Sequence, residues 1–387
     1  MLILSPEEAK VGMKLAAPVP HPEHPEQELL RAGYALEADV IQRLCAMGVQ
    51  YLFVDFPGFE DLDRQLAAFL SPQRQAVYQT MKQTVEASQR RTRPAVSYGE
   101  YYKATRELIT TLLDQGQHPL FLDLMARCGA DHVGHATAVA HLSLLLGIKL
   151  DSYLVEERPR LNARLAKDPV NLGVAGMLHD VGKFHLPENL WNHSIANTPK
   201  SQALVDQWRA HPRIGYELIR EGVEPTAATA VLQHHQHYDG SGFPSIATSS
   251  EQRPLAGKRI HVFARIVQVA DLYDRLATDR VDDGPRRSNL EVLFLLRTRF
   301  GAWSDPIVLR ALEEVAPPFP PGSKLQLSDG TSAIVLRADA GNPYRPVVRR
   351  TVGEEWKFEG APIDLRDDST PAIVSVGRTR TAGLVPA

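Results

Sequence analysis

A histidine and an aspartate stand side by side in the segment LHDVGKFHLP, residues 178–187, and Lys183 follows three positions after the aspartate. The apolar run VAGML leads into the pair, which predicts that it lies near the end of a buried helix. Charge in such a place is costly unless it is compensated, and a metal ion is a common compensation. His179 and Asp180 are therefore candidate metal ligands.

Further residues of the metal-binding types occur in the helical patterns on both sides of this pair. A single histidine or aspartate on an apolar helix is more often a satisfied core group than a ligand. The whole set is different, because five imidazoles and two carboxylates buried without a metal would leave many polar groups unpaired. The candidate ligands are His135, His179, Asp180, His211, His234, His235 and Asp271.

Imidazole and carboxylate ligands without thiolate suit iron, manganese or zinc, and this set exceeds what one tetrahedral ion needs. Two ions bridged by one carboxylate would use the set, and we expect Asp180 to be the bridge. Two ions about 3.5–4 Å apart polarise a phosphoryl group and generate hydroxide near neutral pH, which predicts hydrolysis of a phosphoester. Lys183 would then act in catalysis by neutralising charge on the phosphoryl oxygens. The alternative for this lysine is a surface salt bridge.

The paired histidines open a second informative segment, HHQHYDGSGFP, residues 234–244. Its Asp-Gly-Ser-Gly sequence predicts a sharp loop, which the following proline fixes. Glycine backbone can approach a bulky ligand closely. We therefore expect the loop to contact the substrate through Asp239, Gly240 and Gly242.

The elements that must position these residues are helical. Almost all of residues 98–317 is apolar at helical spacing, and few runs alternate as strands do. This pattern predicts a helical bundle of about 220 residues that contains every candidate ligand. Before it, the polar residues 61–97 predict an amphipathic linker helix.

The two ends of the chain predict small units of a different kind. Residues 1–60 mix β-prone pieces with one helix, from about Glu37 to Met47, which predicts a small independent α/β module. Residues 318–387 have paired β-prone runs about a Ser-Asp-Gly turn, which predicts a β-rich extension with a loose tail from about Ser369, in which SVGR and the final LVPA could still add a strand. The expected fold class is therefore mainly α, with two small flanking units.

Composition excludes several classes of protein. The chain is 43% hydrophobic and 23% charged, as is usual for soluble globular proteins, and its net charge of −3 gives no basic bias towards a nucleic-acid polymer. Its two cysteines, Cys45 and Cys128, lack the spacing of a disulfide framework or a thiolate zinc site. Neither a signal peptide nor a membrane span is indicated. We therefore expect a cytoplasmic location.

The motifs together resemble those of the HD-GYP phosphodiesterases, a bacterial branch of the HD superfamily that hydrolyses cyclic di-GMP. That family has an early histidine, HDxGK, a histidine before proline, HHExxDGxGYP, and an aspartate in VADxxDAL. The chain has His135, HDVGK, His211 before a proline, HHQHYDGSGFP and VADLYDRL. The resemblance covers roughly residues 112–318.

The resemblance implies an HD-type helical catalytic domain that holds two or three iron or manganese ions. A metal-bridging hydroxide would attack a phosphodiester of cyclic di-GMP, giving pGpG or GMP. A third ion would use Asp131, and Arg280 would contact a phosphate. Residues 1–60 are similar to a module common in the family, for which a regulatory role is expected. Diguanylate cyclase domains and a second copy of the chain, in a homodimer, are further candidate partners.

Three departures from the family pattern stand in the substrate-binding region. Gln236 replaces a glutamate, Phe243 replaces a tyrosine, and DRLATDRVDDGPRR stands where the family has DALTSDRPYR, so that Asp283 occupies a basic position. These departures leave open a second hypothesis, a protein that senses cyclic di-GMP or docks a diguanylate cyclase domain without turnover. A third hypothesis keeps the chemistry but assigns another nucleotide substrate.

Overall fold

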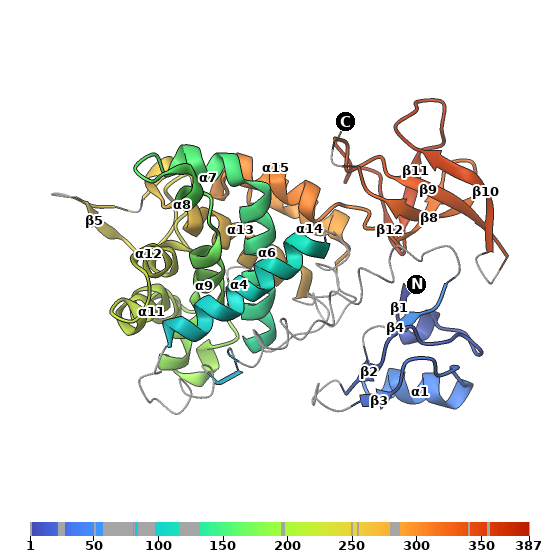
Figure 1. Ribbon diagram of the computed structural model, residues 1–387, viewed down its shortest axis with the longest axis horizontal. Coiled ribbons are helices and arrows are strands. Elements are labelled where there is room, and N and C mark those ends of the chain that lie inside the picture. The colour runs from blue at the N-terminus through green and yellow to red at the C-terminus, as the bar shows by residue number, and fades with distance from the viewer. Residues whose placement is uncertain are drawn as a thin grey trace.

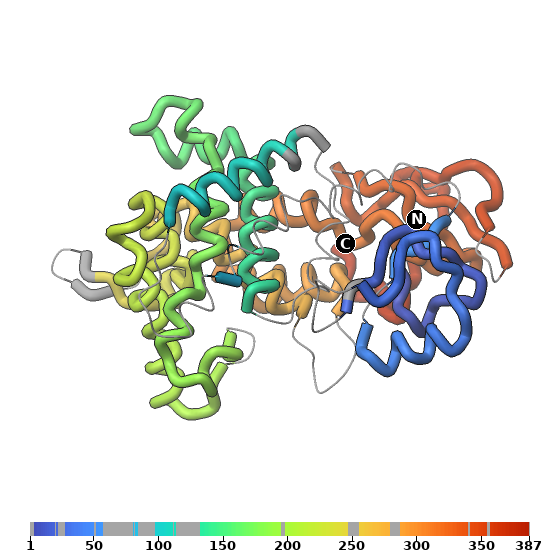
Figure 2. Tube along the Cα trace, turned by 60° about the horizontal axis from the view of Figure 1, so that its bottom comes forward, coloured from blue at the N-terminus to red at the C-terminus, as the bar shows by residue number. Residues whose placement is uncertain are grey.

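The computed structural model describes residues 2–21, 28–49, 52–56, 80, 82–83, 97–115, 132–194, 198–248, 251–253, 255–278, 287–339, 341–353 and 357–386. These residues form a helical body and a β-rich body, which lie side by side in Figures 1 and 2. The β-rich body combines the two ends of the chain. The expected mainly α fold with a small β appendage is confirmed. The predicted linker helix falls almost entirely outside the described residues.

The helical body holds the candidate ligands. Its helices are α4 (Tyr98–Gln115), α6 (His132–Lys149), α7 (Asp151–Glu157), α8 (Ala163–Ala166), α9 (Val170–Leu178), α10 (Gln202–Trp208), α11 (His211–Ile219), α12 (Pro225–Gln233), α13 (Val262–Thr278), α14 (Asn289–Thr298) and α15 (Pro306–Val315). The 3-10 helices are η2 (Val181–His185), η3 (Glu188–Leu190), η4 (Gly257–Arg259) and η5 (Gly301–Trp303), and a β-ribbon pairs β5 (Ile246–Thr248) with β6 (Glu251–Arg253).

Helices α6, α9 and α13 form the centre of this body. Every residue of α13 from Val262 to Ala277 is buried, and α6 and α9 are buried along most of their lengths. Helices α6 and α9 are largely apolar, as buried helices usually are. Helix α13 also carries buried charged side chains, which need a polar partner or a bound ligand because unpaired buried charge is costly.

Within the described residues, no single helix has both the length and the apolar composition to cross a membrane. Helices α6 and α7 would pass this test only as a pair, and they meet at a bend of 84°.

The N-terminal unit is built around a short β-ribbon and one helix. Strands β1 (Leu2–Leu4) and β4 (Leu52–Val54) pair antiparallel, as do β2 (Val19–Pro20) and β3 (Glu28–Leu30). The 3-10 helix η1 spans Pro6–Glu8, and α1 spans Ala38–Ala46, close to the bounds that the sequence predicts for that helix.

The C-terminal unit is a six-stranded antiparallel sheet in the order β10-β9-β8-β7-β11-β12. Its strands are β7 (Lys324–Leu327), β8 (Ser332–Arg337), β9 (Val347–Val352), β10 (Lys357–Asp364), β11 (Ile373–Val376) and β12 (Thr379–Arg380). The segment predicted as a loose tail thus supplies the last two strands, because β11 pairs with β7 in the middle of the sheet.

Strand β8 is buried on both faces of the sheet, since Ala333, Ile334 and Val335 are all buried and successive residues of a strand point in opposite directions. Ala333 and Val335 pack with Leu290 of α14, on the side of the helical body. Ile334 packs instead with the core of the N-terminal unit, and Phe358 stands edge-on to Phe56 with ring centroids 5.3 Å apart. This differs from the independent N-terminal module that the sequence predicts, because that module completes its core with the C-terminal sheet.

Candidate metal centre

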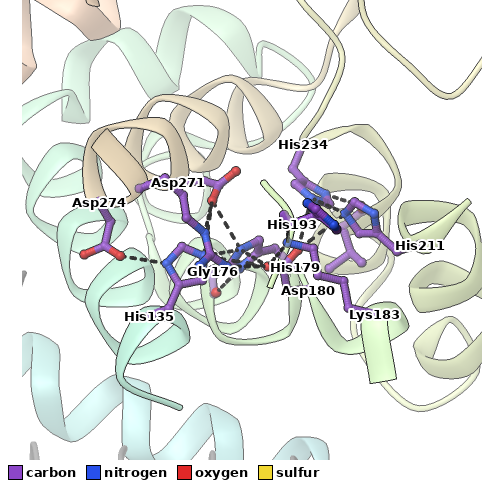
Figure 3. Close-up of polar contacts among 12 residues, drawn as sticks. His135, Gly176, His179, Asp180, Lys183, His193, His211, His234, Asp271 and Asp274 are labelled. Atoms are coloured by element: carbon purple, nitrogen blue, oxygen red, sulfur yellow. Dashed lines mark hydrogen bonds and ion pairs between the residues drawn. The ribbon is translucent and has the colours of Figure 1, made fainter. Parts of the chain in front are cut away.

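The seven predicted ligands, all buried, lie at one place inside the helical body, and Figure 3 labels all of them except His235. They are His135 on α6, His179 and Asp180 after α9, His211 at the start of α11, His234 and His235 after α12, and Asp271 on α13. Helices α9 and α12 both end at the site. The partial negative charge at a helix C-terminus favours a cation, so the backbone adds to the attraction of the side chains.

Asp180 lies between two groups of donors and directs one oxygen to each. Its Oδ1 lies 3.4 Å from Nε2 of His211 and 3.9 Å from Nε2 of His234. Its Oδ2 lies 3.4 Å from Nε2 of His179 and 3.7 Å from Nε2 of His135. This is the geometry of a bridging carboxylate, the role for which we expect Asp180.

We call the first group the His135 half; it consists of His135, His179, Asp271 and Oδ2 of Asp180. Nε2 of His135 lies 3.2 Å from Nε2 of His179 and 3.2 Å from Oδ1 of Asp271. Donor atoms at such separations fit around one ion with ligand distances of about 2.0–2.2 Å.

The second group, the His211 half, consists of His211, His234, His235 and Oδ1 of Asp180, whose donor atoms all lie within 4.8 Å of one another. Nε2 of His235 and Oδ1 of Asp180 are buried and have no hydrogen-bond partner among the described residues. Buried polar atoms are almost always paired. The two orphaned atoms therefore fit a cation between them.

Backbone carbonyls fix the orientation of three of the imidazoles. Nδ1 of His179, His211 and His234 donates in each case to the carbonyl three residues earlier, at 2.8, 2.6 and 2.7 Å. The proton therefore sits on Nδ1, and the lone pair of Nε2 points into the site. Burial lowers the pKa of His234 to about 4, so this ring is neutral near pH 7.

His135 is held by a carboxylate that the sequence analysis does not identify. Its Nδ1 donates to Oδ2 of Asp274 at 2.7 Å. Burial lowers the pKa of His135, but the hydrogen bonds with Asp271 and Asp274 raise it more, with a net increase. The signal for Asp274 is its position three residues after Asp271, on the same face of α13.

Lys183 is part of the centre and not a surface residue. Its Nζ lies 2.7 Å from Oδ2 of Asp180 and donates to the carbonyl of His193 at 3.1 Å, and the residue is only 2% exposed. The surface salt bridge considered as an alternative is therefore wrong. Burial raises the pKa of Asp180, but Lys183 and His179 lower it more, to well below its usual range, so this carboxylate is ionised.

The sequence analysis also misses a second cation beside Asp180, the guanidinium of Arg275. Nη2 of Arg275 lies 3.2 Å from Oδ2 of Asp180, and its Nε lies 3.8 Å from Oδ1 of Asp271. Arg275 stands one helical turn after Asp271 on α13, a spacing that places the two side chains on one face. The segment contains several charged residues, and the contact of this one with Asp180 depends on the tertiary structure.

Gly182 sets the distance between the two parts of the chain that carry Asp180 and His211. A Cβ at Gly182 would lie 2.1 Å from the carbonyl oxygen of His211, which is far closer than atoms can approach. Glycine therefore allows η2 to pack directly on the first turn of α11. This contact places His211 beside the bridging carboxylate.

Trp208 forms one wall of the His211 half and is also missed by the sequence analysis. Its ring centroid lies 5.4 Å from that of His211, 5.5 Å from that of His235 and 5.3 Å from that of Phe243. Its Nε1 donates to the carbonyl of His193, the same oxygen that Lys183 binds. The side chain thus fixes the rings and the lysine together.

Two of the departures from the family pattern have structural roles in the loop after α12. Nε2 of Gln236 donates to the carbonyl of Pro244 at 2.5 Å, and its Oε1 accepts from the N–H of Leu255 at 2.8 Å. Phe243 stacks on His235 with ring centroids 4.6 Å apart, a contact that needs no hydroxyl group.

The predicted substrate loop is a compact turn beside the His211 half. Oδ1 of the exposed Asp239 accepts from the N–H of Ser241 at 2.8 Å, and Gly240 has a φ of 84°. The close approach that Gly242 permits is to the loop itself, because a Cβ there would lie 2.2 Å from N of His237.

Three further predicted positions lie outside the described residues. These are Asp131, Arg280 and Asp283.

Part of the chain is similar to known proteins. Residues 152–306 match the model of the HD domain family. The chain is 29% identical over 182 residues to the cyclic di-GMP phosphodiesterase PA4108 of Pseudomonas aeruginosa, covering 46% of this chain and 40% of the relative. It is 34% identical over 110 residues to the cyclic di-GMP phosphodiesterase response regulator RpfG of Xanthomonas campestris, covering 28% of this chain and 26% of the relative.

A third relative has a different named substrate. It is the 3'3'-cGAMP-specific phosphodiesterase 1 of Vibrio cholerae, 30% identical over 126 residues, which cover 33% of this chain and 27% of the relative. In all three comparisons the chain spans less than half the length of the relative. The family match and the relatives confirm the resemblance that the motifs indicate.

Proposed function

Because this chain carries an HD domain with HD-GYP motifs, we propose that it is a metal-dependent phosphodiesterase that hydrolyses cyclic di-GMP. The observation that carries the proposal is the bridging geometry of Asp180, with one oxygen towards each group of donors. Such a set suits two divalent cations, and we propose iron or manganese as the ions, since all the other donors are imidazoles or a carboxylate.

Two bound cations would supply Lewis acidity to a phosphoryl group and lower the pKa of water. The side chains of the chain itself prepare the site for this chemistry. Asp180 holds the two halves at a fixed separation, and the carbonyl-bound imidazoles present their Nε2 atoms without reorganisation. Preorganised charge of this kind is usually the largest contribution to catalysis.

Lys183 is the proposed catalytic cation. An ammonium group has three N–H donors, and Asp180 and the carbonyl of His193 take two of them. Among the described residues no further hydrogen bond of Lys183 is recorded, so the third donor can serve a phosphoryl oxygen. Lys183 would stabilise the charge that develops on this oxygen as the phosphodiester is cleaved.

The substrate is proposed to lie against the loop at Asp239, Gly240 and Gly242. This loop follows the ligand pair His234 and His235 directly, so a phosphate at the metal site would bring the rest of a nucleotide beside it. Cleavage of one phosphodiester of cyclic di-GMP gives pGpG, and cleavage of both gives GMP. Gln236 does not weaken the proposal, because its side chain is hydrogen-bonded within the loop.

The test is a turnover assay on purified full-length chain, stripped of metal and reloaded with Mn²⁺ or, under reducing conditions, with Fe²⁺. Products from cyclic di-GMP, 3'3'-cGAMP and GTP are separated by chromatography. We expect cyclic di-GMP to be cleaved fastest, and His179→Ala to abolish cleavage. A metal-loaded protein that binds cyclic di-GMP but leaves it intact would support the sensor hypothesis and refute this one. Faster cleavage of 3'3'-cGAMP would reassign the substrate.

A further inference from the structure

The two oxygens of Asp180 have unequal surroundings. Oδ2 lies 2.7 Å from the ammonium of Lys183 and 3.2 Å from the guanidinium of Arg275. Oδ1 is buried and has no hydrogen-bond partner among the described residues. The carboxylate therefore offers a compensated oxygen to the His135 half and an uncompensated one to the His211 half.

Arg275 lies beside both carboxylates of the His135 half. Besides its contact with Asp180, its Nε lies 3.8 Å from Oδ1 of Asp271, and its side chain is 11% exposed. A guanidinium stays charged at any pH at which the protein is folded. Charges interact strongly in a site with so little water, so a cation entering this half meets a fixed positive charge at close range.

We propose that Arg275 is a resident counter-ion of the His135 half and makes the two halves bind metal unequally. The His211 half fills first and more tightly, because its two orphaned atoms, Oδ1 of Asp180 and Nε2 of His235, gain a partner without displacing one. The His135 half fills second, against the charge of Arg275. This inference rests on the proposed metal binding, but it goes beyond the resemblance, because the motif VADxxDAL has alanine where this chain has Arg275.

The role is specific to Arg275 and is not shared equally with Lys183. The ammonium of Lys183 is held by the carbonyl of His193 and by the ring of Trp208, 5.9 Å from Nζ, as well as by Asp180. Arg275 contacts Asp271, which belongs only to the His135 half. Removal of the guanidinium therefore changes the charge of one half more than that of the other.

The test is a calorimetric titration of the metal-free full-length chain with Mn²⁺. We expect the wild type to bind two ions in separate steps. Arg275→Gln keeps most of the side-chain length without the charge, and we expect it to tighten the second step by about tenfold, the scale on which groups next to metal ligands alter affinity. Arg275→Lys keeps the charge and the separation of the steps. Arg220→Gln, at the exposed arginine that directly follows α11, is the matched control and leaves both steps unchanged.

Two ligand variants assign the steps to the halves. His235→Ala removes the tight step, and His135→Ala removes the weak one, if the order is as proposed. The reverse assignment would overturn the inference. So would a single affinity class in the wild type, or an Arg275→Gln protein whose two affinities equal those of the wild type.

An electron paramagnetic resonance measurement tests the order even if Arg275→Gln does not fold. One equivalent of Mn²⁺ in the wild type gives the signal of isolated ions, and the second equivalent gives a coupled pair, since the ions of a bridged site lie about 3.5–4 Å apart. Unequal binding would be refuted if the signal of the coupled pair appeared with the first equivalent and grew in proportion to the Mn²⁺ added. Because these experiments measure binding, a protein that fills in this order but cleaves no nucleotide would refute only the proposed function.

Discussion

Gln236 uses both ends of its amide to hold the loop that follows the paired histidines. The NH₂ group donates to the carbonyl of Pro244, and the oxygen accepts from the N–H of Leu255. A glutamate, the residue of the family motif, has no donor for the Pro244 carbonyl when it is ionised. In this chain the position therefore has a structural role, and its difference from the motif does not remove a metal ligand.

We predict that Gln236→Glu destabilises the helical body by about 1–3 kcal/mol, because a buried carboxylate oxygen would face the carbonyl oxygen of Pro244 without a proton between them. Urea unfolding followed by circular dichroism measures the change. Gln207→Glu, at an exposed residue of α10, is the control and has little effect. Equal stability of the two variants would show that the amide is not needed.

At the scale of the elements, the close packing of η2 on α11 brings the two halves of the centre together. A side chain larger than hydrogen at Gly182 meets the backbone of His211, which cannot move away as the end of a flexible side chain can. Any relief separates α11 from the segment that carries Asp180. The distance from Asp180 to His211 therefore depends on a residue that carries no functional group.

Gly182→Ala is predicted to lower the stability of the helical body by at least about 1–3 kcal/mol, as overpacking does. It is also predicted to weaken metal binding in the His211 half. Elemental analysis after dialysis would then find a lower metal content in the variant than in the wild type. Gly99→Ala is the control, because a Cβ at this position on α4 meets nothing within 4 Å. Wild-type metal content in Gly182→Ala would contradict the role given to this contact.

The residues that meet at the centre could be predicted from the sequence because each belongs to a short motif or to a buried apolar helix. Asp274 and Arg275 stand in the motif VADLYDRL, but their contacts and those of Trp208 could not be predicted, since they depend on which helices meet and at what angle. The helix at Ala38–Ala46 followed from its local pattern. The contact of the N-terminal unit with the C-terminal sheet did not follow from a local pattern, because the two parts lie more than 250 positions apart in the sequence. The sequence contained one signal of this contact: the continuous apolar run AIVL in β8 is typical of a strand buried on both faces.

At the scale of the whole molecule, the C-terminal sheet lies between the helical body and the N-terminal unit. One face packs on Leu290 of α14, and the bond from Arg297 to the hydroxyl of Tyr344, 2.7 Å long, joins the same two parts. The other face contacts the N-terminal unit through Ile334, and Lys324 pairs with Glu8 at 3.1 Å. The N-terminal unit therefore depends for its core on a part of the chain that is made long after it.

Ile334→Ala tests this dependence. Removal of a buried isoleucine side chain leaves a cavity and costs about 2–5 kcal/mol, and here the cavity opens between the sheet and the N-terminal unit. We predict faster hydrogen exchange in β1 and β4 together with β8, while α13 and the metal content of the helical body stay as in the wild type. Val352→Ala, at a residue of β9 that is 44% exposed, is the control in the same sheet. Unchanged exchange in β1 and β4 would mean that the N-terminal unit is stable without this contact. Loss of metal in Ile334→Ala would mean instead that the sheet supports the centre through α14, which packs on α13.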